Sequence, residues 1–365
     1  MSLSWDDLAA LASARQFPES PTDVAGLVDA IGPMQTQTAR SAFLGLAARS
    51  PGITHAAISA AYESASIVRG STIRGTVHTA TPAQYGPLGL ATRIGQHRRW
   101  SNLLGIDRSG LEELWASLED FARDWRTPEE LREQLASMVV AVAHRAEPMP
   151  RAQEQASRYL AFGHGGLVRR PASGNRWEGQ GRPVYRTFDP PGPSTLADVV
   201  RLHLRCHGPA SRHDVAWWSG LPLGVVDETI AELALTSYDG PDGRTYLDLA
   251  DPPPPAAVAG VRLLPEFDAL LCGYDPRARK RFVTPEHQAL LWNAANGLVL
   301  PPLMVDGRLT GSWQAGGSAR KRPLEVHWFA GTRRPRKAEL EEPVAAVEAA
   351  LGITVTGVSI TRMPS

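Results

Sequence analysis

Cysteine and lysine are scarce in this chain of 365 residues. The two cysteines, Cys206 and Cys272, are too few for a disulfide framework or a four-thiolate zinc site, so we expect both to be buried as small hydrophobes and no metal to be bound. Nearly all of the 38 basic residues are arginine. Arginine makes paired hydrogen bonds to phosphate, which is compatible with a phosphate-binding surface, but the composition of the genome would produce the same bias.

Long hydrophobic runs and a signal peptide are also missing. The longest uncharged run, Gln288–Val305, is interrupted by asparagine, glycine and proline, which excludes a membrane span. Asp6 and Asp7 stand where a signal peptide carries positive charge. We therefore expect a cytoplasmic protein that has no membrane partner.

Several common catalytic motifs are absent as well. The chain has no G-x-x-x-x-G-K-[ST] loop, no G-x-S-x-G turn and no H-E-x-x-H helix, which argues against nucleotide hydrolysis, α/β-hydrolase chemistry and zinc proteolysis. The glycine-rich segments 163–166 and 179–181 lack the spacing of a dinucleotide site. We expect that neither a cofactor nor a bound nucleotide is needed.

The charges balance over the whole chain but are unevenly distributed along it. The formal net charge is +0, which excludes a uniformly basic surface. Basic residues nevertheless exceed acidic ones in the segments 69–108, 145–186 and 262–337. Segregated charge of this kind permits a local basic face on a neutral protein.

A short segment in the middle of the chain is isolated by two proline-rich linkers, Asp189–Ser194 and Asp251–Pro255. Apolar residues at helical spacing predict three helices there, over 195–206, 211–218 and 223–235. Asp-Gly pairs then mark the tip of a β-hairpin. This order is typical of a winged helix, whose third helix enters the DNA major groove, although the same order also serves as a plain scaffold.

The same order of elements recurs twice upstream, each time ending in a hairpin. The second copy includes an expected helix over 151–162. Downstream, strand-like segments at 261–264, 269–272, 298–305 and 308–314 precede a terminal helix near 338–351. We therefore predict an α+β fold of three tandem winged helix-turn-helix units, spanning 1–105, 106–190 and 191–255, and a C-terminal β-rich domain, 256–365.

The run Pro33–Thr38 contains an unusual pair of glutamines. Gly32 and Pro33 end one expected helix and Thr38 is expected to cap the next, so the residues between them should be extended. Side chains at i and i+2 of an extended segment point to the same side, so Gln35 and Gln37 should present two amides to one spot. Two amides can hold and orient a water molecule. Taken alone, the pattern is a weak signal and favours two solvated or capping glutamines.

Four motifs in this order resemble the AlkZ/YcaQ family of bacterial DNA glycosylases. They are Met34-Gln35-Thr36-Gln37, Ile73-Arg74-Gly75-Thr76-Val77-His78, Leu263-Leu264-Pro265-Glu266-Phe267-Asp268 and Val305-Asp306-Gly307-Arg308-Leu309-Thr310-Gly311-Ser312-Trp313. The first is similar to the Q-x-Q motif of the AlkZ branch rather than the Q-x-D of the YcaQ branch. Thr36 stands where the family usually has an apolar residue.

The resemblance implies three winged helices around a concave, positively charged surface and a C-shaped molecule. It implies a monofunctional glycosylase that removes N7-alkylated purines from double-stranded DNA. For the AlkZ branch it also implies unhooking of interstrand crosslinks and self-resistance to DNA-alkylating natural products. It gives Gln35 and Gln37 the catalytic positions. Nothing in the sequence demands more than a monomer.

Candidate DNA contacts come from basic residues in the expected hairpins and loops. The candidates are Arg74 and His78 in the first wing, Arg277, Arg279, Lys280 and Arg281 in one basic run, and Arg320, Lys321 and Arg322 in another. Each run can also be a solvated loop, His78 can be bonded to backbone, and Arg74 can brace the fold. The neighbouring Trp217 and Trp218 are expected to be buried in the third unit.

Two other functions remain open from the sequence. A non-catalytic winged-helix regulator would read an undamaged DNA sequence, and a damaged-DNA binder would recognise lesions without turnover. Release of a modified base, abolished by substitution of both glutamines, separates the enzyme from both alternatives.

Overall fold

The computed structural model describes residues 1–19, 23–142, 159–174, 176–293, 295, 297–317 and 319–363, and the side chains of 140–142 are left aside. The expected helix over 151–162 therefore lies mostly outside the described residues. Its last residues, Leu160–Phe162, form a short 3₁₀ helix, η2. The fold is mixed, with helices and strands alternating along the chain.

The first part of the chain has the predicted order of helices followed by a hairpin. Its elements are α1 (Trp5–Gln16), α2 (Val24–Ile31), β1 (Met34–Gln35), α3 (Ser41–Arg49), α4 (His55–Glu63), β2 (Val68–Ser71), η1 (Ile73–Gly75) and β3 (Val77–Ala80). Thr38 does not cap α3 as predicted, because the chain makes a turn first and the N-cap, Arg40, makes no side-chain hydrogen bond to the helix.

The next two parts repeat this order. The second has α5 (Pro82–Leu104), α6 (Arg108–Phe121), α7 (Pro128–Val142), β4 (Leu167–Pro171) and β5 (Pro183–Thr187). The third has α9 (Leu196–His207), β6 (Ala210–Ser211), α10 (Arg212–Ser219), α11 (Leu223–Ala231), β7 (Thr236–Asp239) and β8 (Thr245–Asp248). In each part a short strand or bridge that lies between two helices pairs with the second strand of the hairpin, as β1 with β3, Arg126 with Tyr185 on β5, and β6 with β8.

The hairpins of the first two parts join into one five-stranded sheet of order β1-β3-β2-β4-β5. Gly70 on β2 pairs with Val168 on β4, and a side chain at position 70 would collide with the Tyr85 hydroxyl and the Leu167 carbonyl, so glycine is needed for this close approach. The predicted boundary at residue 105 falls just after α5 but does not separate two sheets. β1 lies at the edge of this sheet.

The C-terminal part contains β9 (Val261–Leu263), α12 (Ala269–Cys272), η3 (Ala278–Arg281), α13 (Pro285–Leu291), β10 (Trp292–Asn293), β11 (Leu298–Val299), β12 (Pro302–Val305), β13 (Arg308–Ala315), β14 (Lys321–Trp328), η4 (Lys337–Leu340), α14 (Glu341–Leu351) and β15 (Thr354–Arg362). Its main sheet has the order β15-β14-β13-β12-β9. The predicted strand at 269–272 is wrong, because the Asp268 carboxylate caps a helical turn there. The predicted strand over 298–305 is two strands, β11 and β12.

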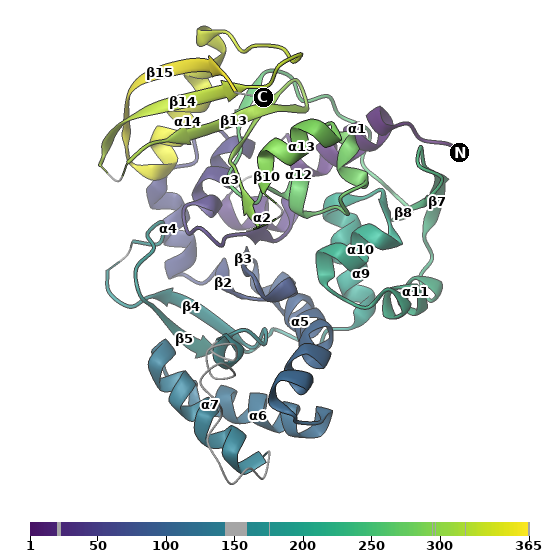
Figure 1. The fold of residues 1–365 in the computed structure, drawn as a ribbon, viewed down its shortest axis with the longest axis vertical. Helices are drawn as coiled ribbons and strands as arrows, with labels where there is room; N and C mark the ends of the chain where they lie inside the picture. The colour runs from purple at the N-terminus through teal and green to yellow at the C-terminus, as the bar shows by residue number, and fades with distance from the viewer. Residues whose placement is uncertain are drawn as a thin grey trace.

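The C-terminal sheet lies at one end of the long axis, α6 and α7 lie at the other, and α9 to α11 lie to one side (Figure 1). Helix α14 returns to the first part of the chain, where Ala346 and Ala350 join the hydrophobic core formed by α2, α3 and α4. Among the helices of the described residues, none combines the length and the apolar character needed to cross a membrane.

Candidate active site

Gln35 and Gln37 lie on the edge strand β1 and its extension, with their side chains on the same side as predicted. Gln35 is half-buried and Gln37 is exposed, whereas the intervening Thr36 is fully buried. The Thr36 hydroxyl lies 3.2 Å from the Thr79 hydroxyl, which bonds in turn to the Tyr62 hydroxyl. These bonds satisfy the hydroxyl of a polar side chain that lies fully in the interior.

The orientation of both glutamine amides is fixed by partners that can only donate. The Nη2 atom of Arg74 donates to Gln35 Oε1 over 2.8 Å, and the backbone N–H of Val77 donates to Gln37 Oε1 over 3.2 Å. An arginine and a backbone N–H have no acceptor, so each amide must turn its oxygen toward its partner. Among the described residues the two NH₂ groups have no hydrogen-bond partner, and each oxygen keeps one lone pair for a ligand.

Both glutamines line one open cavity of about 370 Å³. The other lining residues are Arg74, Thr76, Trp217, Phe267, Trp292, Gly297 and Leu298. Among these described lining residues there is no aspartate, glutamate or histidine. We call this space the glutamine cavity. Its described lining offers amides, one guanidinium and aromatic surface, and no strong general acid or base.

Arg279 braces the aromatic wall of the glutamine cavity and does not contact solvent. Its guanidinium carbon lies 4.1 Å from the ring centre of Trp292 and 5.2 Å from that of Trp217, and its Nε donates to the carbonyls of Leu271 and Tyr274. Because only 2% of Arg279 is exposed, the expected phosphate contact is wrong. Trp217, expected to be buried, is 37% exposed because it forms part of this wall.

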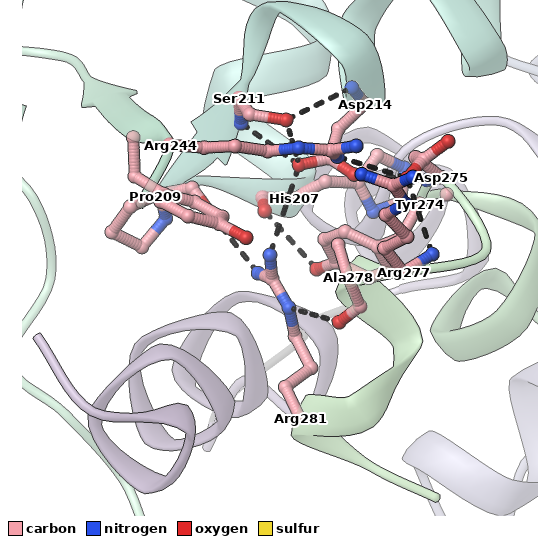
Figure 2. A network of polar contacts seen from close by, with 12 residues as sticks. His207, Pro209, Ser211, Asp214, Arg244, Tyr274, Asp275, Arg277, Ala278 and Arg281 are labelled. Carbon is pink, nitrogen blue, oxygen red and sulfur yellow. Dashed lines mark hydrogen bonds and ion pairs between the residues drawn. The ribbon is translucent and has the colours of Figure 1, made fainter. Parts of the chain in front are cut away.

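Arg281 is also internal and does not contact DNA phosphate as expected. Its Nη1 donates to the Pro209 carbonyl over 3.0 Å and its Nε to the Ala278 carbonyl, and the guanidinium stacks on Tyr274 beside the buried carboxylate of Asp214 (Figure 2). Burial raises the pKa of Asp214. Arg281 therefore links α10 to the C-terminal part.

The other members of the two basic runs are exposed or half-buried, and none of them lines the glutamine cavity. Arg277 and Lys280 are exposed in the loop and 3₁₀ turn before α13. Arg320 and Lys321 are exposed at the start of β14, where Arg322 is half-buried and donates to the Gly317 carbonyl over 2.8 Å. Their contact with DNA stays a prediction.

Arg74 acts within the protein rather than as a free phosphate ligand. It sits in η1 with φ of 57°, a left-handed conformation that is costly for a residue with a side chain. This turn aims the guanidinium at both Gln35 and the Trp218 carbonyl. Burial lowers the pKa of Arg74. We interpret Arg74 as the residue that positions Gln35.

His78 lies opposite Gln35 in the β1–β3 pairing but is 2% exposed, so direct contact with DNA is not supported. Its Nδ1 lies 3.0 Å from the Thr72 hydroxyl and 3.1 Å from the Thr76 carbonyl, so the ring is held by groups of its own hairpin. Burial, followed by the charge of Arg74, lowers the pKa of His78 to about 3. His78 is therefore neutral at physiological pH and braces the site.

Buried neutral histidines should make the protein sensitive to acid. Burial lowers the pKa of His203 to about 4, and that of His207 lies well below its usual value, as for His78. In the unfolded chain each has a pKa of about 6.5, so the unfolded state binds more protons below that pH. The contribution of these histidines to the free energy of unfolding is fully present above about pH 6.5. It should fall by up to about 1.4 kcal/mol per pH unit for each histidine as the pH drops toward 4.

Urea unfolding at pH 7 and pH 5 measures this loss. His203→Gln removes one of the buried histidines that bind a proton on unfolding, so the free energy of unfolding should depend less steeply on pH. Substitution of the half-buried His327 should leave the slope unchanged. An unchanged slope in His203→Gln would contradict the assignment.

A second, larger cavity of about 890 Å³ lies over β2, β4 and β5. Five arginines line it: Arg69, Arg123, Arg169, Arg170 and Arg186. Arg170 and Arg186 stack on Trp125, with guanidinium carbons 4.1 Å and 4.9 Å from a ring centre. The positive segments 69–108 and 145–186 contain four of these arginines, but the sequence did not indicate that they converge. We call this space the arginine cleft.

Comparison with known proteins identifies the family. The family model of DNA glycosylase AlkZ-like proteins matches residues 28–350, whereas no curated protein sequence matches the chain. The solved structure of Streptomyces sahachiroi DNA glycosylase AlkZ has a similar fold, with a TM-score of 0.78 and 22% identity over 99% of this chain and 100% of that one. The chain therefore belongs to the AlkZ-like family of DNA glycosylases, hydrolases that cleave the N-glycosyl bond between a base and its sugar in DNA.

Proposed function

We propose that this protein is a monofunctional DNA glycosylase for N7-alkylated purines that acts as a monomer on double-stranded DNA. The observation that carries the proposal is the pair of oriented amides of Gln35 and Gln37 in an open cavity whose described lining has no carboxylate. Gln35 and Gln37 are the catalytic residues of this proposal.

Such a site suits a base that is already a good leaving group. Alkylation at N7 gives the purine a positive charge, so the base departs as a neutral molecule and needs no proton from the enzyme. The sugar then develops positive charge, and a water molecule must be placed at C1′ to add to it and then lose a proton to the surrounding solvent. Amide groups can hold that water in position, which is a contribution of orientation rather than of acid or base strength.

The same geometry favours crosslinked substrates. A base tethered to the opposite strand cannot rotate fully into an enclosed pocket, as most enzymes that act on bases require. Gln37 is exposed and the glutamine cavity is open. We therefore propose that the enzyme also unhooks interstrand crosslinks and provides resistance to a DNA-alkylating natural product.

We infer three winged-helix units and a C-terminal β-rich domain from the repeated order of elements, with the boundaries predicted above. The third unit does not use its third helix in the usual way, because the charged residues of α11 are Asp227 and Glu228, and both repel phosphate. We place the DNA backbone instead along the arginine cleft, as part of the concave basic surface.

Loss of positive charge in the arginine cleft should weaken binding to duplex DNA of any sequence. Arg170→Gln with Arg186→Gln removes two exposed guanidiniums, so the slope of log affinity against log salt concentration should fall by about two. Fluorescence anisotropy with a labelled duplex at several salt concentrations measures it. Arg334→Gln, an exposed arginine outside the cleft, is the control, and equal slopes in both variants would contradict this path for the DNA.

The direct test of the proposed reaction is release of N7-methylguanine from methylated duplex DNA, followed by alkali treatment to break the strand at the vacated sites. A monofunctional enzyme gives breaks only after alkali. The alternative regulator would instead bind one undamaged sequence tightly and release no base.

A further inference from the structure

Phe267 lines the glutamine cavity and is more exposed than the acidic residues on either side of it in the sequence. In most proteins the phenylalanine would be buried and the acidic residues exposed. Glu266 is 8% exposed and Asp268 is 3% exposed. Glu266 accepts from Arg40 and Ser41, and Asp268 accepts two hydrogen bonds from the buried Arg49 over 2.9 Å and 3.1 Å. The carboxylates on either side of the phenylalanine therefore anchor its backbone in the protein interior.

The backbone of Phe267 is held in a left-handed conformation with φ of 60°. A bulky residue rarely adopts it, and it persists only where the surroundings impose it. Here the two anchored carboxylates impose it. The strained turn directs the Phe267 ring to the wall that also contains Gln35 and Gln37.

The other two aromatic residues of the glutamine cavity are engaged by Arg279, which stacks on Trp217 and Trp292. Within the described part of the chain, no aromatic ring or cationic group stacks on Phe267. Phe267 is half-buried and packs partly against the C-terminal hydrophobic core, so the part of its side chain that lines the glutamine cavity is what remains available for a planar ligand. An aromatic face attracts a cation through its quadrupole and stacks on any nucleobase.

We propose that Phe267 stacks on the alkylated purine and determines the preference of the site for a cationic base over a neutral one. This inference rests on the proposed function. The described lining of the glutamine cavity has no carboxylate, and its one guanidinium, that of Arg74, repels a cation, so the attraction for a positively charged ring must come from aromatic faces. Phe267 would bind the base while Gln35 and Gln37 act at the sugar.

Binding to a lesion that resists cleavage tests this inference separately from catalysis. The probes are two duplexes that differ only in N7 methylation of one 2′-fluoro-deoxyguanosine, since fluorine at C2′ disfavours the positive charge that develops during hydrolysis. Wild type should bind the methylated duplex about 3- to 30-fold more tightly. Phe267→Leu keeps an apolar side chain and should lose most of this preference, whereas Phe267→Tyr should keep it.

The outcomes separate the two proposals. A wild type that shows no preference, or Phe267→Leu with the wild-type preference, would overturn the role of Phe267. A preference that depends on Phe267, together with no release of N7-methylguanine from cleavable DNA, would support this inference and overturn the proposed reaction. Circular dichroism of both variants establishes that they are folded.

Discussion

Replacing Gln35 or Gln37 by alanine is expected to lower the rate of N7-methylguanine release by about 100- to 1000-fold, the range seen when one oriented polar group is removed from an active site. The two amides act on the same water molecule, so the double variant should be little slower than the slower single variant. Single-turnover measurement of base release from a methylated duplex gives these rates.

Gln314→Ala provides the matched control. Gln314 is an exposed glutamine on β13 that bonds to Glu325, and it does not line the glutamine cavity. Its substitution should leave the rate unchanged. Rates in both single variants within a few-fold of wild type, with unchanged thermal unfolding, would show that the amides do not perform the reaction.

The position of the glutamine pair could be predicted from the sequence because it depends on local rules. Gly32 and Pro33 end α2, and the alternation of an extended segment then sets Gln35 and Gln37 on one side of Thr36. The hairpins and most helices follow from similarly local signals. The start of α3 was predicted too early, at Thr38, because the chain first makes a turn and the helix then begins without a side-chain cap.

The burial of Arg279 and Arg281 could not be predicted in this way. Three of their partners, Trp217, Pro209 and Asp214, lie more than sixty residues away in the sequence. A run of basic residues resembles a solvated loop until those distant groups are placed beside it. The apolar residues that flank the basic ones, Ala278, Phe282 and Val283, were the available signal, since all three are buried. The same limit applies to Trp292 and Phe267, which reach the glutamine cavity from elements far from β1.

The buried pair of Arg49 and Asp268 should dominate the stability of the site. The side chains are 1% and 2% exposed, so Asp268→Ala leaves a guanidinium without its counter-charge in the interior. We expect a loss of about 3–5 kcal/mol in the free energy of unfolding. Glu266→Ala should cost less, because its partner Arg40 is 40% exposed and can turn to solvent. Urea unfolding compares the two variants.

A double variant separates burial of an unpaired charge from loss of an attractive interaction. Arg49→Met with Asp268→Leu removes both charges and keeps apolar volume, so it should recover much of the stability lost in Asp268→Ala. If the double variant is no more stable than Asp268→Ala, the cost arises from the cap of α12 or from packing, and not from the unpaired guanidinium. The anchored carboxylate of Asp268 also holds the strained turn at Phe267. A double variant that recovers stability should therefore bind the methylated 2′-fluoro duplex, but without the wild-type preference for it.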